Sequence, residues 1–287
     1  MIETQMVEQS IGRPVASISR KPYSFQTSHR IDELTVELMD GTHIELLLKD
    51  LRKPGPSASG SLARPDFLDN PRREQEAYHL LGDAGLGIPI RYNAGGHWLL
   101  LERVQGVELW QVGDLEAWVM AARWLARFHA QFVQQTPTND HLIRYDADYF
   151  RQWPARAKRA RPGLGPVVAR YDRVIEILTA LPTTLVHGEF YPSNVLVSGD
   201  RIATVDWEMA GTGPGVLDLA ALVTGWGEKE CAKIVEGYSA VPREALDAAQ
   251  LHLSLQWLGW SHDWIPPPEH TRDWLAEALA AAERLGL

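Results

Sequence analysis

The sequence predicts an α+β fold of two lobes, a β-rich N-terminal lobe with one helix and a mainly helical C-terminal lobe. Three observations support this prediction. Apolar residues alternate with strand period in the first third of the chain, and they recur with helical period after Gly106. A short hairpin pattern near residues 195–205 interrupts the helical part. A hinge near residues 102–106 divides the chain into expected lobes of residues 1–102 and 103–287.

The strands of the first lobe follow from alternation and turn signals. Residues 31–39 alternate, Asp40-Gly41 is a strong hairpin signal, and residues 44–48 form an apolar run that ends at Lys49. Together with residues 17–23, these segments are expected to form three antiparallel strands. Two further strands of this lobe are expected at residues 88–93 and 97–102.

The one helix of the first lobe begins at Asn70-Pro71 and runs to about Gly82, because Asn is a good N-cap and Pro suits the first helical turn. Residues 53–61, which are Gly, Pro, Ser, Ala and Lys, form a loop by composition. Ser24 and Ser28 bound a polar turn between the first two strands.

Most of the second lobe has helical periodicity. Apolar residues from Leu115 to Phe132 predict a long buried helix. Two more helices are expected at 146–160 and 166–180, strands at 184–187, 195–197 and 202–205, and helices again from Gly215 onward.

Composition restricts the class of protein. The 287 residues are 45% hydrophobic and 23% charged, which is typical of a globular protein. A net charge of −9 argues against a nucleic-acid partner, since phosphate binding needs a basic surface. No stretch approaches the roughly 20 apolar residues that span a bilayer, and residues 1–20 do not read as a signal peptide. A single cysteine, Cys231, cannot form an internal disulfide, so we expect a cytoplasmic protein. We also expect a monomer or a homodimer with no membrane partner.

The chemistry is concentrated in residues 187–208. Glu189 and Asn194 share one loop, and Asp206 ends a strand twelve residues after Asn194. The intervening hairpin returns the chain, so Asn194 and Asp206 are expected to lie close together. An Asn oxygen and an Asp oxygen suit Mg²⁺, which uses few protein ligands. With Glu189 placed to orient or deprotonate a hydroxyl, the natural reaction is phosphoryl transfer from a nucleotide.

These motifs resemble the aminoglycoside phosphotransferase and choline kinase family, which has a protein-kinase-like fold. That family's catalytic loop reads His-Gly-Asp, four residues and Asn, and its metal strand reads Ile-Asp-Trp or Ile-Asp-Phe followed by Glu. The corresponding segments here are His187-Gly188-Glu189…Asn194, Val205-Asp206-Trp207-Glu208 and the helix start Asp218-Leu219-Ala220. The resemblance spans about residues 20–225.

The resemblance implies a nucleotide site in the first lobe. Lys49 would contact the α- and β-phosphates of ATP or GTP, and Glu74 would hold that lysine. Glu76 is the alternative partner for Lys49, but it falls on a different face of the helix from Glu74, so only one of the two can point at the lysine. Without such a partner, a strand-end lysine is ordinarily just solvated.

The same resemblance assigns the phosphate turn and the hinge. The turn with Ser24 and Ser28 would cover the phosphates in place of a Gly-rich loop, although an ordinary polar hairpin is an equal alternative. In the hinge, Glu102, Arg103 and Val104 would offer backbone hydrogen bonds to the base. His187 and Asp218 would brace the catalytic loop without direct chemistry.

Glu189 departs from the family pattern. The extra methylene moves the carboxylate by about 1.5 Å, and a misplacement of about 1 Å can cost on the order of 10²-fold in rate. Glu189 is therefore either a working base in an adjusted site or the mark of a non-catalytic Mg-nucleotide-binding module, a pseudokinase. We favour the working base because Lys49, Asn194 and Asp206 are all retained.

The acceptor would lie between the catalytic loop and the final helices, as an aminoglycoside, amino alcohol, sugar or related metabolite. Glu208 and Trp207 are candidate lining residues. Trp257, Trp260 and Trp264 share one helical face, which is either core packing or an aromatic wall for a sugar or a cation. Nearby Asp263, Glu269 and Asp273 would suit an amine, whereas the five basic residues within 151–161 would suit an anion. The alternative for both sets of charges is an ordinary solvated surface.

Two other enzyme classes account for less of the sequence. A protein kinase would need an activation loop, and only eleven residues separate Asp206 from Asp218. A metal hydrolase built on Asp206 and Glu208 would leave Lys49 and the hinge unexplained.

Overall fold

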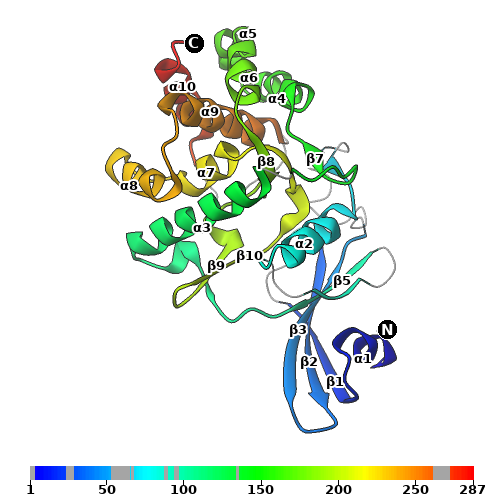
Figure 1. The fold of residues 1–287 in the computed structure, drawn as a ribbon. Helices are drawn as coiled ribbons and strands as arrows, with labels where there is room; N and C mark the ends of the chain where they lie inside the picture. Colours follow the sequence, from blue (N-terminus) through cyan, green and yellow to red (C-terminus); the bar gives the residue numbers. More distant parts are fainter. Residues whose placement is uncertain are drawn as a thin grey trace.

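The computed structural model describes residues 4–23, 29–52, 65, 68–86, 90–93, 97–133, 136–260 and 272–287. Figure 1 shows a sheet-based lobe at one end of the molecule and a larger helical lobe at the other, with the two termini far apart. This is the two-lobed α+β class that the sequence predicts. The loop expected at residues 53–61 lies outside the described residues.

A five-stranded sheet forms the first lobe, in the order β1-β2-β3-β5-β4 with every neighbouring pair antiparallel. The three expected strands and their hairpin are confirmed, and Gly41 has the positive φ of 79° that a tight turn favours. The strands are β1 (Val15–Pro22), β2 (Arg30–Leu38), β3 (His43–Asp50), β4 (Ile90–Asn93) and β5 (Trp98–Glu102).

The two faces of this sheet have different roles. One face packs leucine and valine side chains of β2 and β3 against Val7 of α1 (Thr4–Ile11) in a small separate core. Strand period places Lys49 and Leu47 on the opposite face, toward the helical lobe. The sequence did not predict α1, because eight residues carry too little periodicity to distinguish a helix from a loop.

Helix α2 (Arg73–Asp83) lies between the sheet and the helical lobe. The prediction that Asn70 is its N-cap is wrong, because the N-cap is Arg72 and its side chain makes no capping bond. Asn70 instead accepts a hydrogen bond from Arg72 N at 3.0 Å and donates one to His141 O at 3.3 Å. Its side chain therefore forms a turn and ties the start of α2 to the helical lobe.

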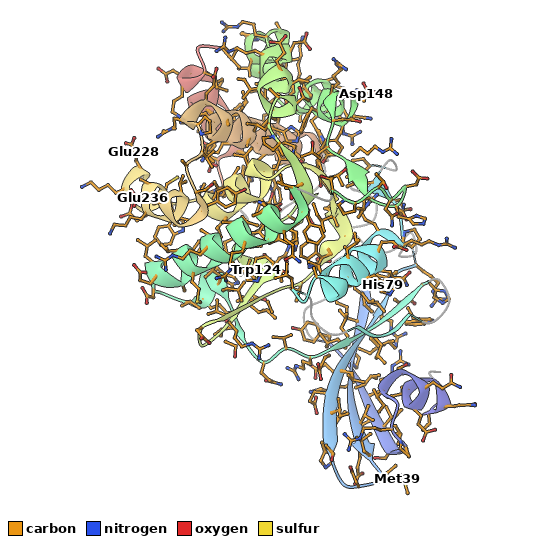
Figure 2. The ribbon with its side chains drawn as sticks, viewed as in Figure 1. Met39, His79, Trp124, Asp148, Glu228 and Glu236 are labelled. Carbon is orange, nitrogen blue, oxygen red and sulfur yellow. The ribbon has the colours of Figure 1, made fainter. Side chains whose placement is uncertain are left out.

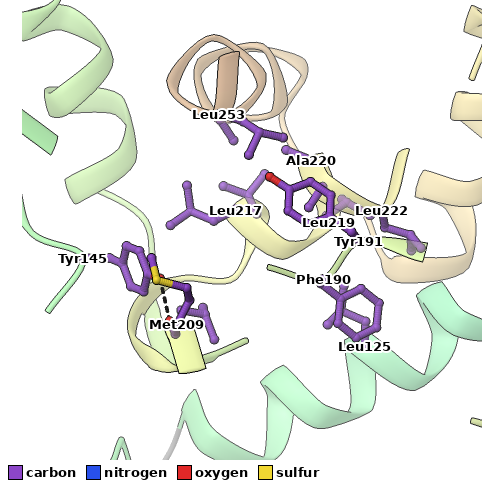
Figure 3. Packing of buried hydrophobic residues seen from close by; sticks show 14 of the residues in the cluster. Leu125, Tyr145, Phe190, Tyr191, Met209, Leu217, Leu219, Ala220, Leu222 and Leu253 are labelled. Carbon is purple, nitrogen blue, oxygen red and sulfur yellow. Dashed lines mark hydrogen bonds between the residues drawn. The ribbon is translucent and has the colours of Figure 1, made fainter. Parts of the chain in front are cut away.

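The helical lobe is built around α9 (Arg243–Trp260), which contacts α4, α6, α7 and α10. Figure 3 shows its core, where leucines of α7 and α9 meet the residues of the 187–194 loop. The helix expected at 166–180 is instead two short helices. The lobe's other helices are α3 (Leu115–Val133), α4 (Ala147–Ala160), α5 (Gly165–Ala169), α6 (Asp172–Thr179), α7 (Val216–Val223), α8 (Glu228–Tyr238) and α10 (Trp274–Arg284).

Two small sheets shape the cleft side of this lobe. The expected hairpin is present as β9 (Val195–Ser198) and β10 (Arg201–Thr204), joined by β6 (Val107–Glu108). The second sheet, in the order β7-β11-β8, was not predicted beyond β8, since β7 has only two residues and β11 is rich in glycine. Its strands are β7 (Ile143–Arg144), β8 (Thr183–Val186) and β11 (Gly211–Pro214).

These sheets carry two loops. Residues 187–194 run from β8 to β9, and residues 205–210 run from β10 to β11. Across the described part of the chain, no helix has both the length and the apolar character that a membrane span requires.

Candidate active site

Asp218 of α7 holds the start of the 187–194 loop through hydrogen bonds to its backbone. This carboxylate is completely buried, and its two oxygens accept the backbone N–H of His187 at 2.7 Å and of Gly188 at 2.8 Å. Its Oδ2 also lies 3.1 Å from His129 Nε2. The bracing role expected for Asp218 follows directly from these contacts, since a buried carboxylate needs such donors.

His187 connects this loop to the 205–210 loop. Its Nε2 lies 2.9 Å from Val205 O, and its Nδ1 accepts the Glu189 backbone N–H at 3.3 Å. Burial lowers the pKa of His187, against the opposing charge of Asp218. Because a carbonyl only accepts, Nε2 carries the hydrogen and the ring is a neutral structural link.

Asn194 and Asp206 are brought together by the hairpin, as expected. Val205 N donates to Asn194 O at 3.0 Å, which makes the residue before Asp206 a direct neighbour of Asn194. The Asn194 amide nitrogen donates to Glu189 O at 3.0 Å, so the amide oxygen remains the acceptor of that side chain. Asp206 has a left-handed backbone with φ of 62°, an uncommon conformation outside glycine.

This donor set fits a hard cation that keeps most of its waters. The carboxylate of Asp206 is about one-third exposed, and both Asp206 and Asn194 supply oxygen, the ligand type of Mg²⁺. The described residues hold no group of three or more His, Cys, Asp or Glu side chains arranged for a metal. A cation here would rely on two protein ligands together with phosphate oxygens and water.

Lys49 bridges the two lobes. Its Nζ lies 2.8 Å from Glu74 Oε2 and 2.7 Å from Asp206 Oδ1. Glu74, and not Glu76, is the α2 partner, because Glu76 accepts a hydrogen bond from Asn139 at 3.0 Å. Strand β3, helix α2 and the 205–210 loop therefore converge on a single ammonium group.

The charges of this cluster are strongly coupled. Burial alone lowers the pKa of Lys49, but the charges of Asp206, Glu74 and Glu208 raise it well above its usual range. Burial raises the pKa of Glu74 to about 7, against the opposing charge of Lys49. Lys49 therefore stays positively charged, as a group that binds phosphate must.

Glu208 and Trp207 do not lie where the sequence suggested. Glu208 is buried, its Oε2 lies 3.5 Å from His29 Nε2, and its charge acts on Lys49. Trp207 has no exposed surface and packs on His187 with ring centroids 4.3 Å apart. Trp207 is thus a core residue and offers no face to an acceptor, and Glu208 belongs to the lysine cluster.

The Trp face of α9 is divided between two packing partners. Trp257 lies parallel to Trp274 at 5.1 Å, and Trp260 lies parallel to Trp153 at 5.8 Å. Because each of these indoles has one face against another indole, the core-packing alternative describes Trp257 and Trp260 better than a continuous aromatic wall. Trp264 lies outside the described residues, as do Asp263 and Glu269.

The assignments of the hinge and of the phosphate turn stay predictions, apart from the backbone N–H of Arg103. Arg103 N donates to Glu45 O at 3.0 Å, so this amide is already used within the protein. Base recognition by Glu102 and Val104 stays a prediction. Ser24 and Ser28 lie outside the described residues, and their contact with phosphate also stays a prediction.

Sequence reasoning missed three residues near the site. His29 faces Glu208 across the cleft, Arg73 donates to Glu208 O at 2.9 Å, and Tyr145 donates to Met209 O at 2.6 Å. Each acts through a contact between segments far apart in the chain, and two of the three bonds are to backbone oxygens. Such contacts leave no pattern in a single sequence.

A cavity of about 340 Å³ opens beside this cluster, between α2, β7 and α4. Tyr149 forms part of its wall. Burial raises the pKa of Tyr149 and the charge of Glu189 raises it further, so the cavity wall is within electrostatic reach of the catalytic loop. Among the described residues that line the cavity, the acids are Asp69 and Asp140 and the arginines are Arg73 and Arg144.

This geometry is that of a kinase-like phosphotransferase site. Lys49 joins the two lobes, Asp218 holds the 187–194 loop, and Asn194 lies next to the strand end that carries Asp206. The model of the phosphotransferase enzyme family (APH) matches residues 27–252, so the chain belongs to this family. It is an enzyme, a small-molecule kinase with a hydroxyl acceptor. No curated protein sequence matches the chain.

Solved structures share this fold at low sequence identity. A choline kinase of Cryptosporidium parvum Iowa II is 11% identical with a TM-score of 0.62, covering 93% of this chain and 88% of that one. A macrolide 2'-phosphotransferase of Brachybacterium faecium is 17% identical with a TM-score of 0.58, covering 93% and 91%. An aminoglycoside-3'-phosphotransferase of type VIII is 18% identical with a TM-score of 0.57, covering 82% and 93%.

Proposed function

We propose that this protein transfers the γ-phosphoryl group of ATP or GTP to a hydroxyl of a small acceptor, with Glu189 in the place of the usual catalytic aspartate. The observation that carries the proposal is the convergence of Lys49, Glu74 and Asp206 above the loop that bears Glu189 and Asn194. Two similar structures support the choice of ATP, since one is a choline kinase complexed with AMP and another a streptomycin–ATP phosphotransferase complex.

Each residue has a defined part in the reaction. Lys49 binds the α- and β-phosphates, and Glu74 keeps its ammonium pointed into the cleft. Glu189 orients the acceptor hydroxyl and receives its proton. As the acceptor oxygen forms a bond to the γ-phosphorus, the bond from phosphorus to the β-phosphate oxygen breaks and the nucleoside diphosphate leaves. Because the transition state is loose, orientation contributes more than basicity, which a carboxylate on a longer arm can still provide.

Asn194 and Asp206 would hold the Mg²⁺ that accompanies the nucleotide. A bound Mg²⁺ supplies positive charge to the phosphate oxygens. The Asn194 side chain also fixes the loop, because its amide N–H donates to the carbonyl of Glu189. The residue that binds the cation and the residue that receives the proton are therefore held in one rigid unit.

Among acceptors, we favour an uncharged, hydroxyl-rich molecule such as a sugar. We take the cavity next to Tyr149 as the acceptor site; the described residues that line it include two acids and two arginines, and Asp140 and Arg144 pair at 3.2 Å. A polycationic aminoglycoside would require an excess of carboxylates. An amino alcohol would profit from open aromatic faces, and one face of each of Trp257 and Trp260 is covered by another indole.

The test of Glu189 compares Glu189→Gln with wild type in nucleoside diphosphate release, across sugars, aminoglycosides and choline-like amines. The expected result is a loss of kcat on the order of 10²-fold with Mg-nucleotide affinity retained. Glu236→Gln, on an exposed face of α8, is the matched control. Wild-type turnover by Glu189→Gln would show that Glu189 is not the base. Nucleotide binding by the wild type without turnover of any acceptor would favour the pseudokinase alternative.

A further inference from the structure

Two tryptophans near the C-terminus belong to a chain of ring contacts that ends at the catalytic loop. Trp257 of α9 lies parallel to Trp274, the first residue of α10, with ring centroids 5.1 Å apart and planes 6° apart. The Arg272 guanidinium lies 5.6 Å from the centroid of Trp274, and Trp257 meets Tyr191 at 5.6 Å and 66°. We call Arg272, Trp274, Trp257 and Tyr191 the C-terminal stack.

A hydrogen bond joins this stack to the loop. Trp257 Nε1 donates to the Tyr191 hydroxyl at 2.5 Å. An indole N–H can only donate, so the phenol oxygen is the acceptor and its own O–H points elsewhere. Tyr191 follows Glu189 by two residues, and its backbone N–H donates to Glu189 O at 2.7 Å. The α9 helix is therefore linked to the backbone of Glu189 through the side chains of Trp257 and Tyr191.

The loop is fixed from two opposite sides. In Figure 3, Phe190 is directed toward Leu125 of α3, whereas Tyr191 lies beside Leu219 and Leu222 of α7. Phe190 is completely buried, and Trp124 stacks on it with centroids 5.9 Å apart. Neither ring can move without repacking the helical lobe, so the Glu189 backbone has little freedom.

We propose that Trp257 is a positioning residue for Glu189, because its bond to Tyr191 sets the loop geometry from which the longer glutamate arm reaches the acceptor hydroxyl. The inference rests on the proposed function, in which Glu189 receives the proton. A glutamate has one more rotatable bond than the aspartate of the family pattern, so it needs a more rigid loop to reach one position. Burial raises the pKa of Tyr191 and the charge of Glu189 raises it further, which places the phenol within electrostatic reach of that carboxylate.

The experiment is a double-mutant cycle of Trp257→Phe and Tyr191→Phe. Both changes keep an aromatic ring and remove one partner of the hydrogen bond. We expect each single variant to lower kcat about tenfold while the KM for the nucleotide and the melting temperature stay close to wild type. We expect the double variant to be no slower than either single one, because the two residues act as a unit. Trp118→Phe, a buried indole of α3 packed on Trp226, is the matched control and leaves kcat unchanged.

Three results would overturn the inference. The first is a wild-type kcat in both single variants while Glu189→Gln is inactive. This result would rule out the positioning role of Trp257 and leave the proposed function intact. The second is a set of effects that multiply in the double variant. The third is a loss of kcat that parallels a fall in melting temperature and a rise in nucleotide KM, as for a purely structural contact. If Glu189→Gln retains wild-type turnover, the proposed function fails together with this inference.

Discussion

Lys49 and Asp206 are 157 residues apart in the chain, and their charged groups lie 2.7 Å apart across the two lobes. Strand β3 supplies the ammonium, and the loop after β10 supplies the carboxylate. Because Lys49 also pairs with Glu74 at 2.8 Å, one ammonium group joins β3, α2 and the loop after β10.

Replacement of Lys49 separates its two contributions. Lys49→Met leaves Glu74 and Asp206 without their cation, and we expect a loss of about 3 kcal/mol in the free energy of unfolding and of on the order of 10²-fold in kcat/KM. Adding Glu74→Gln to Lys49→Met removes the buried carboxylate, so it should restore part of the stability and none of the activity. Urea denaturation and steady-state kinetics measure the two effects. Recovery of activity in the double variant would contradict the role assigned to Lys49.

Gly188 must be glycine for two independent reasons. Its φ is 84°, and a Cβ there would lie 2.2 Å from the Tyr145 hydroxyl and 2.3 Å from Met209 O. We expect Gly188→Ala to cost about 3 kcal/mol or more in stability and to distort the loop that carries Glu189. Gly163→Ala is the control, since nothing lies within 4 Å of the added methyl and no positive φ is required. Thermal unfolding that is equal for the two variants would refute this account.

We expect Asp218 to affect activity indirectly, by fixing the 187–194 loop through its hydrogen bonds to that loop's backbone. Asp218→Asn replaces one carboxylate oxygen by an NH₂ group, which cannot accept the N–H of His187 or Gly188. An unsatisfied buried donor costs about 1–3 kcal/mol, so we expect reduced stability and reduced kcat. Asp148→Asn, at an exposed carboxylate on α4 (Figure 2), should change neither. Circular dichroism melts and kinetics at saturating nucleotide test the pair.

His252 predicts a specific dependence of stability on pH. Burial lowers the pKa of His252 to about 3, and its Nδ1 lies 2.7 Å from the Tyr171 hydroxyl. The unfolded chain takes up this proton near pH 6.5, whereas the folded protein does not. The contribution of neutral His252 to the free energy of unfolding is therefore complete above pH 6.5. It is lost as pH falls toward 3, at about 1.4 kcal/mol per pH unit.

The matched variant is His252→Asn, which keeps an acceptor for Tyr171 and does not titrate. Between pH 7 and pH 5, wild type should lose about 2 kcal/mol more stability than this variant. Urea denaturation at each pH gives the difference. Parallel curves of unfolding free energy against pH for the two proteins would show that His252 does not cause the loss of stability at low pH.

Local features of the sequence were sufficient where an element is defined by its own residues. The alternation over 31–39 and the Asp40-Gly41 turn predict β2, β3 and their hairpin, and the 3.6-residue period of 115–132 predicts α3. The hairpin between Asn194 and Asp206 also brings those two residues together by local chain geometry alone. The spacing of Glu189, Asn194 and Asp206 was enough to indicate phosphoryl transfer.

Contacts between distant segments could not be predicted in this way. Asn70 looks like a helix cap, but His141, 71 residues later, provides a carbonyl that draws its side chain away. Trp207 lies within the metal motif and Trp257 and Trp260 share a helical face, yet packing partners elsewhere in the chain cover Trp207 and one face of each of the other two. Whether an aromatic residue is core or wall depends on what the fold places against it, and periodicity does not contain that information.

The sequence by itself predicted the two lobes and the proximity of Asn194 and Asp206, because short-range patterns and spacing encode them. The pairing of Lys49 with Glu74 was implied only by the family resemblance of the motifs. Only the tertiary structure decided that Lys49 closes onto Asp206, that Glu76 serves Asn139, and that Trp257 reaches Tyr191. These contacts arise where α2, α9 and the two cleft loops pack together. The free energy that selects them comes from burial and charge pairing between segments that no local pattern connects.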